Sequence, residues 1–363
     1  MNSELSYWLA FTKIPNIGPV RFQKIRKHFN SLEEAWHAPH GDFITAGIPS
    51  NIAQEITLRR SEVNPDSLIA ELVQNKVLAV TLEDEAYPKL LKEIPDAPPV
   101  LYYKGDLGDD ELLLSVVGTR KMSPYGKQVV ETLVPSAIRA GATIVSGLAL
   151  GVDAHAHTTC LTRNGRTIAV LASGLDTNSI YPSHNRFIAK KIISEGGLLV
   201  SERPIGATPL KTHFPQRNRI IAGLSQATLV IEAAQKSGAN ITAYQALEYN
   251  RSVGAVPGSM FSPLSTGCHA LLQKGAAVVS SADDVLSLLG ISDHSMKDKA
   301  IPRDLLTEQE EALYAFISFE PTSFDSIVQK TGLDAASTAR LITHLEMKGY
   351  ITDTGGRQYV KIV

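Results

Sequence analysis

The sequence predicts an α/β protein built on a doubly wound, mostly parallel β-sheet, with an all-α segment before the sheet and a small helical domain with a hairpin after it. From residue 112 onward, short runs rich in β-branched residues alternate with amphipathic segments of helix length. The short runs are apolar throughout instead of alternating with polar residues, which is typical of strands covered by helices on both faces.

The runs and the helix candidates follow one another in regular phase, so each run is expected to be one strand. The expected strands span 112–118, 142–147, 167–174, 196–202, 227–233, 252–258 and 276–280. The expected helices between them include 124–140, 183–194, 216–225, 238–250 and 282–289. This order predicts an extended Rossmann-like sheet in a central domain of residues 66–292.

Residues 1–65 show no strand signal and are expected to form an all-α domain. Within it, "IPNIGPVRFQKIRKHF" (14–29) places a Pro-x-x-Gly-Pro turn before a basic amphipathic helix. This resembles a helix-hairpin-helix or SAM-like element, whose tight turn can aim backbone N–H groups at a phosphate. A plain hairpin between packed helices fits the pattern equally well. The acidic, proline-rich residues 61–106 are expected to form a bridge into the sheet.

Residues 305–363 are expected to form a winged-helix domain, after a polar, aperiodic linker at 293–304. Thr307 and Glu310 have the spacing of a capping box, Gly332 is placed to end the second helix, and Gly355-Gly356 to turn a hairpin. The third helix of such domains often enters the major groove of DNA. Because residues 303–363 carry a net charge of −3, weak duplex binding and protein docking both remain open.

Composition places the chain among globular proteins with a sizeable core. It has 363 residues, of which 44% are hydrophobic and 20% charged, so two or three domains are expected. No run resembles a signal peptide or approaches the length of about 20 residues that spans a bilayer. With only two cysteines, Cys160 and Cys268, a disulfide framework is not expected and a reducing cytoplasm is the predicted location.

A basic, glycine-rich edge is predicted where the parallel strands end. Residues 107–292 carry a net charge of +4 although the whole chain carries −2. Five strands are followed by loops rich in Gly, Ser, Thr, Asn, Lys and Arg: "GTRKMSPYG", "SGLALGVDAHAH", "SGLDTNSIYPSHNR", "SERPIGATPLKTHFPQRNR" and "EAAQKSGANIT". Ligands of open α/β sheets bind at this edge, and such residues satisfy phosphate oxygens. The pattern favours an extended ligand with several phosphates.

Arginines and aromatic residues interleave along these loops. The arginines are Arg120, Arg186, Arg217 and Arg219, and the aromatic residues are Tyr125, Tyr181, Phe187 and Phe214. Because Arg217 and Arg219 are two positions apart on a helix, they cannot share a face, and one is expected to meet the ligand while the other is structural. Bases stack on aromatic rings in single-strand binders, so the mixture favours single-stranded nucleic acid.

Catalytic motifs are not evident, and no catalytic residue, metal or cofactor is expected. The strongest metal candidate is "DAHAH" (153–157), but His155 and His157 diverge by about 200° on a regular helix. Asp153 is instead expected to cap a helix N-terminus, and His157 to be packed or hydrogen-bonded. The alternative function is that of a Rossmann-fold nucleotide phosphoribohydrolase, although the Pro-Gly-Gly-x-Gly-Thr loop of those enzymes is missing.

Several motifs together resemble the DprA/Smf family in order and spacing. They are "VVGTRKMSPYG", "SGLALGVDAHAH", "YPSHN", "SERP", "FPQRNRIIAGLS", "EAAQKSGANITA" and "AVPG…TGCHALLQKGA". The resemblance covers roughly residues 90–300, and the flanking helical and winged-helix domains also resemble that family's layout. It implies a DNA-processing protein of natural transformation that binds and protects incoming single-stranded DNA, displaces or bypasses single-strand binding protein, and loads the RecA recombinase.

The resemblance also implies site residues and a homodimer formed through residues 252–285. The implied DNA contacts are Gly118, Thr119, Arg120, Ser146, Gly147, Arg217, Asn218, Arg219, Ser237, Gly238 and Thr242. Where many members carry Lys or Arg, this chain has Ser183, and Arg186 or Lys190 is expected to supply that charge. Asn240 and His269 also depart from the family pattern.

Overall fold

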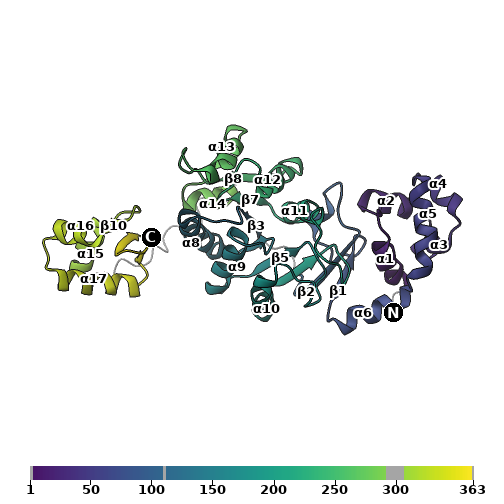
Figure 1. Cartoon of the computed structure of the whole chain (residues 1–363), viewed down its shortest axis with the longest axis horizontal. Helices are drawn as coiled ribbons and strands as arrows, with labels where there is room; N and C mark the ends of the chain where they lie inside the picture. Colours follow the sequence, from purple (N-terminus) through teal and green to yellow (C-terminus); the bar gives the residue numbers. More distant parts are fainter. Residues whose placement is uncertain (1–2, 109–111, 292–305, 362–363) are drawn as a thin grey trace. The chain divides into compact units, whose positions relative to one another are not determined.

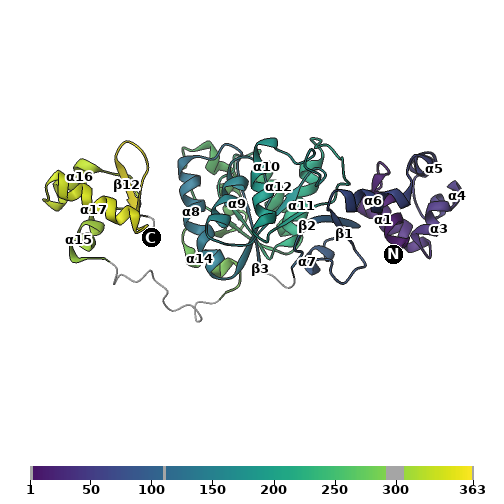
Figure 2. The same cartoon turned by 90° about the horizontal axis from the view of Figure 1, so that it is seen from below.

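The computed structural model describes residues 3–108, 112–291 and 306–361, which belong to two compact units divided after Ile291. The first unit contains the N-terminal helices and the large sheet, and the second contains the C-terminal helices and a small sheet (Figures 1 and 2). The linker expected at 293–304 lies outside the described residues.

Six short helices form the N-terminal part of the first unit. They are α1 (Ser3–Lys13), α2 (Pro19–His28), α3 (Leu32–His37), α4 (His40–Thr45), α5 (Ser50–Arg59) and α6 (Pro65–Gln74). Aromatic residues fill the core between them, with the Phe11 and Trp36 ring centroids 5.1 Å apart. The Thr12 hydroxyl lies 2.7 Å from that of Tyr102, so α1 is tied directly to the sheet.

The sheet has nine strands in the order β1-β2-β6-β5-β4-β3-β7-β8-β9. Their bounds are β1 (Leu78–Thr81), β2 (Val100–Gly105), β3 (Leu112–Val117), β4 (Ala142–Ser146), β5 (Thr167–Leu171), β6 (Leu198–Ser201), β7 (Ala227–Val230), β8 (Ser252–Ala255) and β9 (Ala277–Val278). Neighbouring strands from β3 to β9 pair in parallel. Every strand that the sequence predicts is present, and the predicted α/β fold is confirmed.

The segment expected to be a bridge is more ordered than predicted, and that prediction was wrong. Residues 61–106 contain the whole of α6, both antiparallel strands β1 and β2, and α7 (Lys89–Lys92) between them. Strand β1 pairs with β2, and β2 pairs antiparallel with β6, extending the sheet at one edge. Pro98 and Pro99 stand directly before β2 and obscure its strand pattern.

Helices cover both faces of the sheet, as expected for a doubly wound fold (Figures 1 and 2). Helices α8 (Pro124–Arg139), α9 (Val152–Thr162), α10 (Arg186–Ser194) and α14 (Ala282–Leu288) pack along one face, and α11 (His213–Leu224), α12 (Gly238–Glu248) and α13 (Thr266–Gln273) along the other. The two faces bury separate apolar clusters. Strand β4 lies on one side of β3 and β7 on the other, so the strand order switches from one side of β3 to the other.

The second unit has the predicted winged-helix arrangement. It contains α15 (Glu308–Phe316), β10 (Thr322–Ser323), α16 (Phe324–Thr331), α17 (Ala335–Met347), β11 (Ile351–Asp353) and β12 (Gln358–Lys361). Thr307 and Glu310 form the capping box, and Gly332 ends α16 in the left-handed region at φ +67°. Gly355 and Gly356 also have positive φ, at the turn between β11 and β12.

A buried acidic residue joins two helices of this unit. Glu310 of α15 is 1% exposed and accepts a hydrogen bond of 2.7 Å from Lys348 Nζ. That bond, with the N–H and hydroxyl of Thr307, lowers the pKa of Glu310 to about 2.

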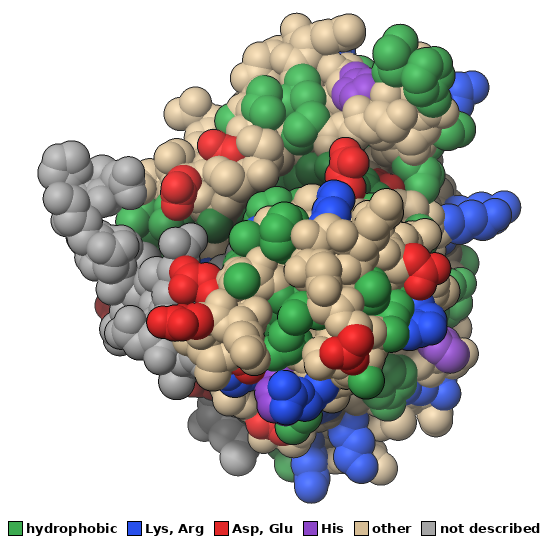
Figure 3. Space-filling view, turned by 90° about the vertical axis from the view of Figure 1, so that its left-hand side faces the viewer, with side chains coloured by type: hydrophobic (Ala, Val, Ile, Leu, Met, Phe, Trp, Pro, Cys, Tyr) green, Lys and Arg blue, Asp and Glu red, His purple; other side chains and the backbone are tan. Residues whose placement is uncertain are grey.

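On the face of the molecule drawn in Figure 3, acidic, basic and hydrophobic side chains are interspersed.

Cys160 and Cys268 are both buried free thiols, in keeping with the expectation of no disulfide framework. Among the described residues, no helix is both long enough and apolar enough to cross a membrane.

Candidate nucleic-acid interface

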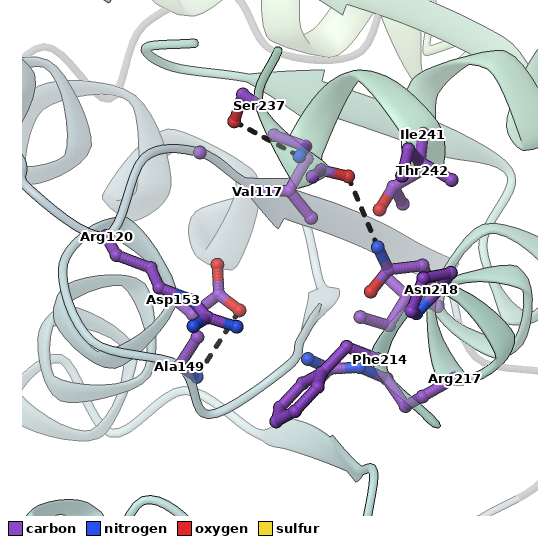
Figure 4. A pocket seen from close by; sticks show the side chains of 15 residues that line it. Val117, Arg120, Ala149, Asp153, Phe214, Arg217, Asn218, Ser237, Ile241 and Thr242 are labelled. Carbon is purple, nitrogen blue, oxygen red and sulfur yellow. Dashed lines mark hydrogen bonds between the residues drawn. The ribbon is translucent and has the colours of Figure 1, made fainter. Parts of the chain in front are cut away.

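A pocket of about 280 Å³ opens at the carboxyl end of β3, where the strand order of the sheet switches sides (Figure 4). We call it the β3 pocket. Four parts of the chain line it: the end of β3 with the loop after it, the loop after β4 with the start of α9, residues 214–221 of α11, and the start of α12 with the residue before it. The predicted site residues that line it are Gly118, Arg120, Arg217, Asn218, Ser237, Gly238 and Thr242.

Close backbone packing fixes the loop after β3. A Cβ atom at Gly118 would lie 2.6 Å from Cγ2 of Val152, so only glycine fits there. The Thr119 N–H donates to the Glu232 carbonyl at 2.8 Å, and the Val152 N–H donates to the Thr119 carbonyl at 3.2 Å. These contacts place Arg120 at the mouth of the pocket. Thr119 itself flanks the pocket and does not line it.

Arg120 and Phe214 face each other at this mouth (Figure 4). Arg120 is exposed, and its guanidinium carbon lies 5.1 Å from the centroid of the half-buried Phe214 ring. A cation near an aromatic face is attracted to it, and this attraction orders both side chains. The guanidinium of Arg120 keeps its positive charge for a ligand. The arrangement offers a ligand one positive group and one flat apolar surface.

Arg217 forms a buried charge at the pocket wall. It is 4% exposed, and Nη1 donates to the Val170 carbonyl at 2.6 Å. A Cβ atom at Gly147 would overlap its guanidinium, so Gly147 makes room for Arg217 without lining the pocket. Burial lowers the pKa of Arg217 to about 10, against the opposing effect of Asp153, and the side chain remains protonated at neutral pH.

Asp153 lies in the first turn of α9 and holds the loop that precedes this helix. Its carboxylate accepts hydrogen bonds from the N–H groups of Gly147 at 3.1 Å and Ala149 at 3.4 Å. The prediction that Asp153 caps this helix was wrong, because Gly151 is the N-cap residue and the Asp153 carboxylate binds the preceding loop. Burial raises its pKa, and the charge of Arg217 and the two N–H groups oppose that rise.

The two histidines of the "DAHAH" segment lie in different surroundings. His157 is fully buried, and its Nδ1 lies 2.7 Å from the Thr167 hydroxyl, which confirms the prediction of a packed, hydrogen-bonded residue. Burial lowers the pKa of His157 to about 3, so the ring is neutral. His155 Nε2 lies 3.0 Å from Glu131 on α8. Within the part of the chain that the structure describes, no three His, Cys, Asp or Glu residues are grouped to hold a metal.

The start of α12 supplies the opposite wall of the pocket. Ser237 caps this helix, with its hydroxyl accepting from the Ala239 N–H at 3.3 Å. The Asn218 amide donates to the Gly238 carbonyl at 3.2 Å, joining α11 to α12 (Figure 4). Backbone N–H groups at the start of a helix attract anions, so this wall is suited to a phosphate.

Arg219 and Ser146 lie away from the pocket. Arg219 is 5% exposed and forms ion pairs with Glu202 and, at 3.5 Å, with Asp96. Arg217 therefore faces the pocket while Arg219 belongs to the scaffold, as their spacing on one helix requires. The Ser146 hydroxyl is buried and donates to the Val116 carbonyl at 2.7 Å, beneath the end of the sheet.

Arg186 also lies outside the pocket. At the start of α10, its Nε donates to the Ile180 carbonyl at 3.2 Å and its Nη2 to the Asn178 carbonyl at 2.5 Å. Whether Arg186 or Lys190 replaces the charge missing at Ser183 stays a prediction.

Sequence reasoning missed the apolar part of the pocket. Ile221 and Ile241 line it together with the pocket arginines. An apolar residue on an amphipathic helix carries the same signal whether it faces the core or a ligand, so nothing in the sequence sets these two apart.

The chain matches two family models in sequence. Residues 78–290 match the model of DNA recombination-mediator protein A, and residues 297–357 match that of the DprA winged-helix domain. Protein Smf of Synechocystis sp. is 38% identical, over 99% of each chain. DNA processing protein DprA of Streptococcus pneumoniae is 44% identical, over 58% of this chain and 74% of that one.

Solved structures agree with these matches. The X-ray structure of DprA from S. pneumoniae has a TM-score of 0.67 at 36% identity, covering 78% of this chain and 97% of that one. The DprA structure from Helicobacter pylori, described for its single-stranded DNA binding mode, has a TM-score of 0.52 at 34% identity, covering 58% and 96%. The chain is therefore a member of the DNA recombination-mediator protein A family, to which the DprA and Smf proteins belong.

Proposed function

We propose that this protein binds single-stranded DNA in the β3 pocket and acts without catalysing a reaction. The observation that carries the proposal is the convergence of Arg120, Phe214, Arg217 and the start of α12 on one pocket. Guanidinium groups and helix N-termini bind phosphate oxygens, and an aromatic ring stacks on a base. The Helicobacter pylori relative, described for binding single-stranded DNA, supports the same ligand for this chain.

The shape of the pocket favours a single strand over a duplex. A base can reach the Phe214 ring only when it is unstacked and its backbone bends freely, which a single strand permits at little cost. In a duplex, unstacking and unpairing a base costs a few kcal/mol. A preference for single strands therefore follows from stacking of a base on the half-buried Phe214 ring.

The proposal extends to recombination. Membership of the recombination-mediator family supports a role in protecting incoming single strands, bypassing single-strand binding protein and loading RecA in the cytoplasm during natural transformation. A homodimer through residues 252–285 belongs to the same proposal. The edge strand β9 in this range supports it, because Val278 is 56% exposed there.

Three experiments test this function. Fluorescence anisotropy of the full chain with single-stranded and duplex oligonucleotides of one sequence should show tighter binding of the single strand, and equal affinity would contradict the proposal. Incubation with nucleoside monophosphates should release no free base, whereas release would favour the phosphoribohydrolase alternative. RecA loading is read separately, as faster RecA ATP hydrolysis on DNA coated with single-strand binding protein.

A further inference from the structure

The side chain of Glu232 occupies the N-terminus of α8, the helix that follows the first strand of the parallel sheet. The Ser123 N–H donates to Glu232 Oε2 at 2.9 Å, and the Ser123 hydroxyl donates to Oε1 at 2.5 Å. Glu232 is 4% exposed and stands two residues after the end of β7, the strand next to β3. A buried carboxylate thus reaches across from the neighbouring strand to this helix end.

This is the position where dinucleotide-binding sheets hold a pyrophosphate. A carboxylate resembles part of a phosphate, because it has negative charge and two oxygens that accept hydrogen bonds. Few donors remain for a second anion in the first turn of α8. The Ser123 N–H and hydroxyl bond to Glu232, Pro124 has no N–H, and the Gly126 N–H donates to the Ser123 hydroxyl at 3.1 Å.

A glycine makes room for this carboxylate. A Cβ atom at Gly126 would lie 2.7 Å from Cδ of Glu232 and closer still to Oε2. In a dinucleotide fingerprint, a glycine allows the backbone to approach the phosphates. Here Gly126 allows the same close approach to the chain's own acid. Residues 115–128 follow the first parallel strand and contain only two glycines, Gly118 and Gly126, where a dinucleotide fingerprint has three. A site that is filled from within explains this partial fingerprint.

We propose that Glu232 is a specificity-determining residue that substitutes for phosphate at the start of α8 and closes this site to nucleotide phosphates. Its carbonyl also accepts the Thr119 N–H at 2.8 Å, so the same residue fixes the loop that carries Arg120. The phosphates of a ligand therefore bind in the β3 pocket, on the other side of that loop. That Glu232 fills the N-terminus of α8 does not depend on DNA binding. That ligand phosphates bind in the β3 pocket instead rests on the proposed function.

Chemical rescue with formate tests the inference. In Glu232→Ala the carboxylate is removed and its space is open, whereas in Glu232→Gln the space stays filled by a neutral amide. Thermal unfolding is measured for the full chain in potassium formate against potassium chloride at equal ionic strength. Glu131→Ala is the matched control, because it removes one acidic side chain from the surface of α8 itself.

Glu232→Ala should be destabilised in chloride and stabilised saturably by formate. At ten times the midpoint concentration, its ratio of folded to unfolded protein should rise about tenfold. Wild type, Glu232→Gln and Glu131→Ala should show no such gain, and formate bound elsewhere would affect all four proteins alike. A crystal structure of Glu232→Ala should place formate on the Ser123 N–H.

An equal formate effect in wild type, or no saturable effect in Glu232→Ala, would overturn the inference. If Glu232→Ala folds only when purified in formate, that dependence supports it, and loss of folding on transfer to chloride completes the test. A strong formate response of Glu232→Gln would contradict it independently, because its helix end is already filled. None of these measurements uses DNA, so they can fail while the proposed function holds.

Discussion

The guanidinium of Arg120 lies over the ring of Phe214, with 5.1 Å between its central carbon and the ring centroid. The two residues come from the loop after β3 and from the start of α11, and they meet because both lie at the carboxyl ends of the parallel strands. Their pairing places a charge for phosphate beside a surface for a base. The binding predictions below follow from this arrangement.

Replacing Arg120 with alanine should weaken single-strand binding more than tenfold at moderate salt while the fold is retained. Arg120 is the exposed cation of the pocket, so its loss removes a phosphate contact and lowers the salt dependence of log Kd by about 1. Anisotropy titrations over a range of salt concentrations measure both effects. Arg163→Ala is the control. It removes an exposed arginine that follows α9 and lies near the amino ends of the strands, away from the pocket. Unchanged affinity of Arg120→Ala would count against the site.

Replacing Phe214 with alanine should reduce single-strand affinity between about fivefold and about 150-fold, the equivalent of about 1–3 kcal/mol for one stacked base. Phe214→Trp should retain most of the affinity, because an indole also stacks. Phe319→Ala removes a ring that is 64% exposed in the winged-helix unit and should change little. Equal affinity of the alanine and tryptophan variants would show that no base stacks at position 214.

Replacing Arg219 with alanine should lower the free energy of unfolding by about 3 kcal/mol, because its loss leaves Glu202, whose side chain is 10% exposed, partly uncompensated. Arg203, which lies 3.2 Å from Glu202, limits the damage. Urea denaturation measures this loss, and anisotropy should find the folded variant close to wild type in DNA affinity. The opposite pattern, with intact stability and lost binding, would place Arg219 in the interface.

The winged-helix unit should lose stability in acid through Glu310. Its pKa is lowered from 4.5 to about 2, so the stabilisation is complete above the unfolded value and is lost as the pH falls through about 2. Hydrogen exchange of peptides from α15 and α17 in the full chain, compared with Glu310→Gln at each pH, measures it. The two proteins should differ most above pH 4.5 and converge toward pH 2. A constant difference across that range would contradict the assignment.

Deleting residues 303–363 should leave most of the single-strand affinity intact. These residues carry a net charge of −3, and the β3 pocket lies wholly within the other unit. Anisotropy with the truncated and full chains decides the matter. Loss of binding on truncation would move the principal site to the winged-helix unit.

The sequence predicts the elements whose signal is local. The strands from β3 to β9 are found by their apolar runs, and the capping box at Thr307 by its spacing. Strands β1 and β2 are missed because they are defined by pairing, β2 with β6 from a distant part of the chain. Their own patterns are short, and two prolines stand directly before β2.

The candidate site divides in the same way. The spacing of Arg217 and Arg219 predicts that they differ in role, but which one is structural depends on tertiary contacts with Glu202 and Asp96. Glu232 is overlooked because an acid at the end of a strand has no special signal until Ser123 is seen beside it. Local patterns identify the pocket's loops, and tertiary contacts decide what each residue does there.

Mapping the bound strand tests the central claim most directly. An oligonucleotide carrying a photoreactive thymine analogue is crosslinked to the full chain, and the modified peptides are identified by mass spectrometry. Crosslinks to the peptides around Phe214, Arg120 and Ser237–Thr242 are the predicted result. Crosslinks confined to the N-terminal helices or to residues 306–361 would contradict it.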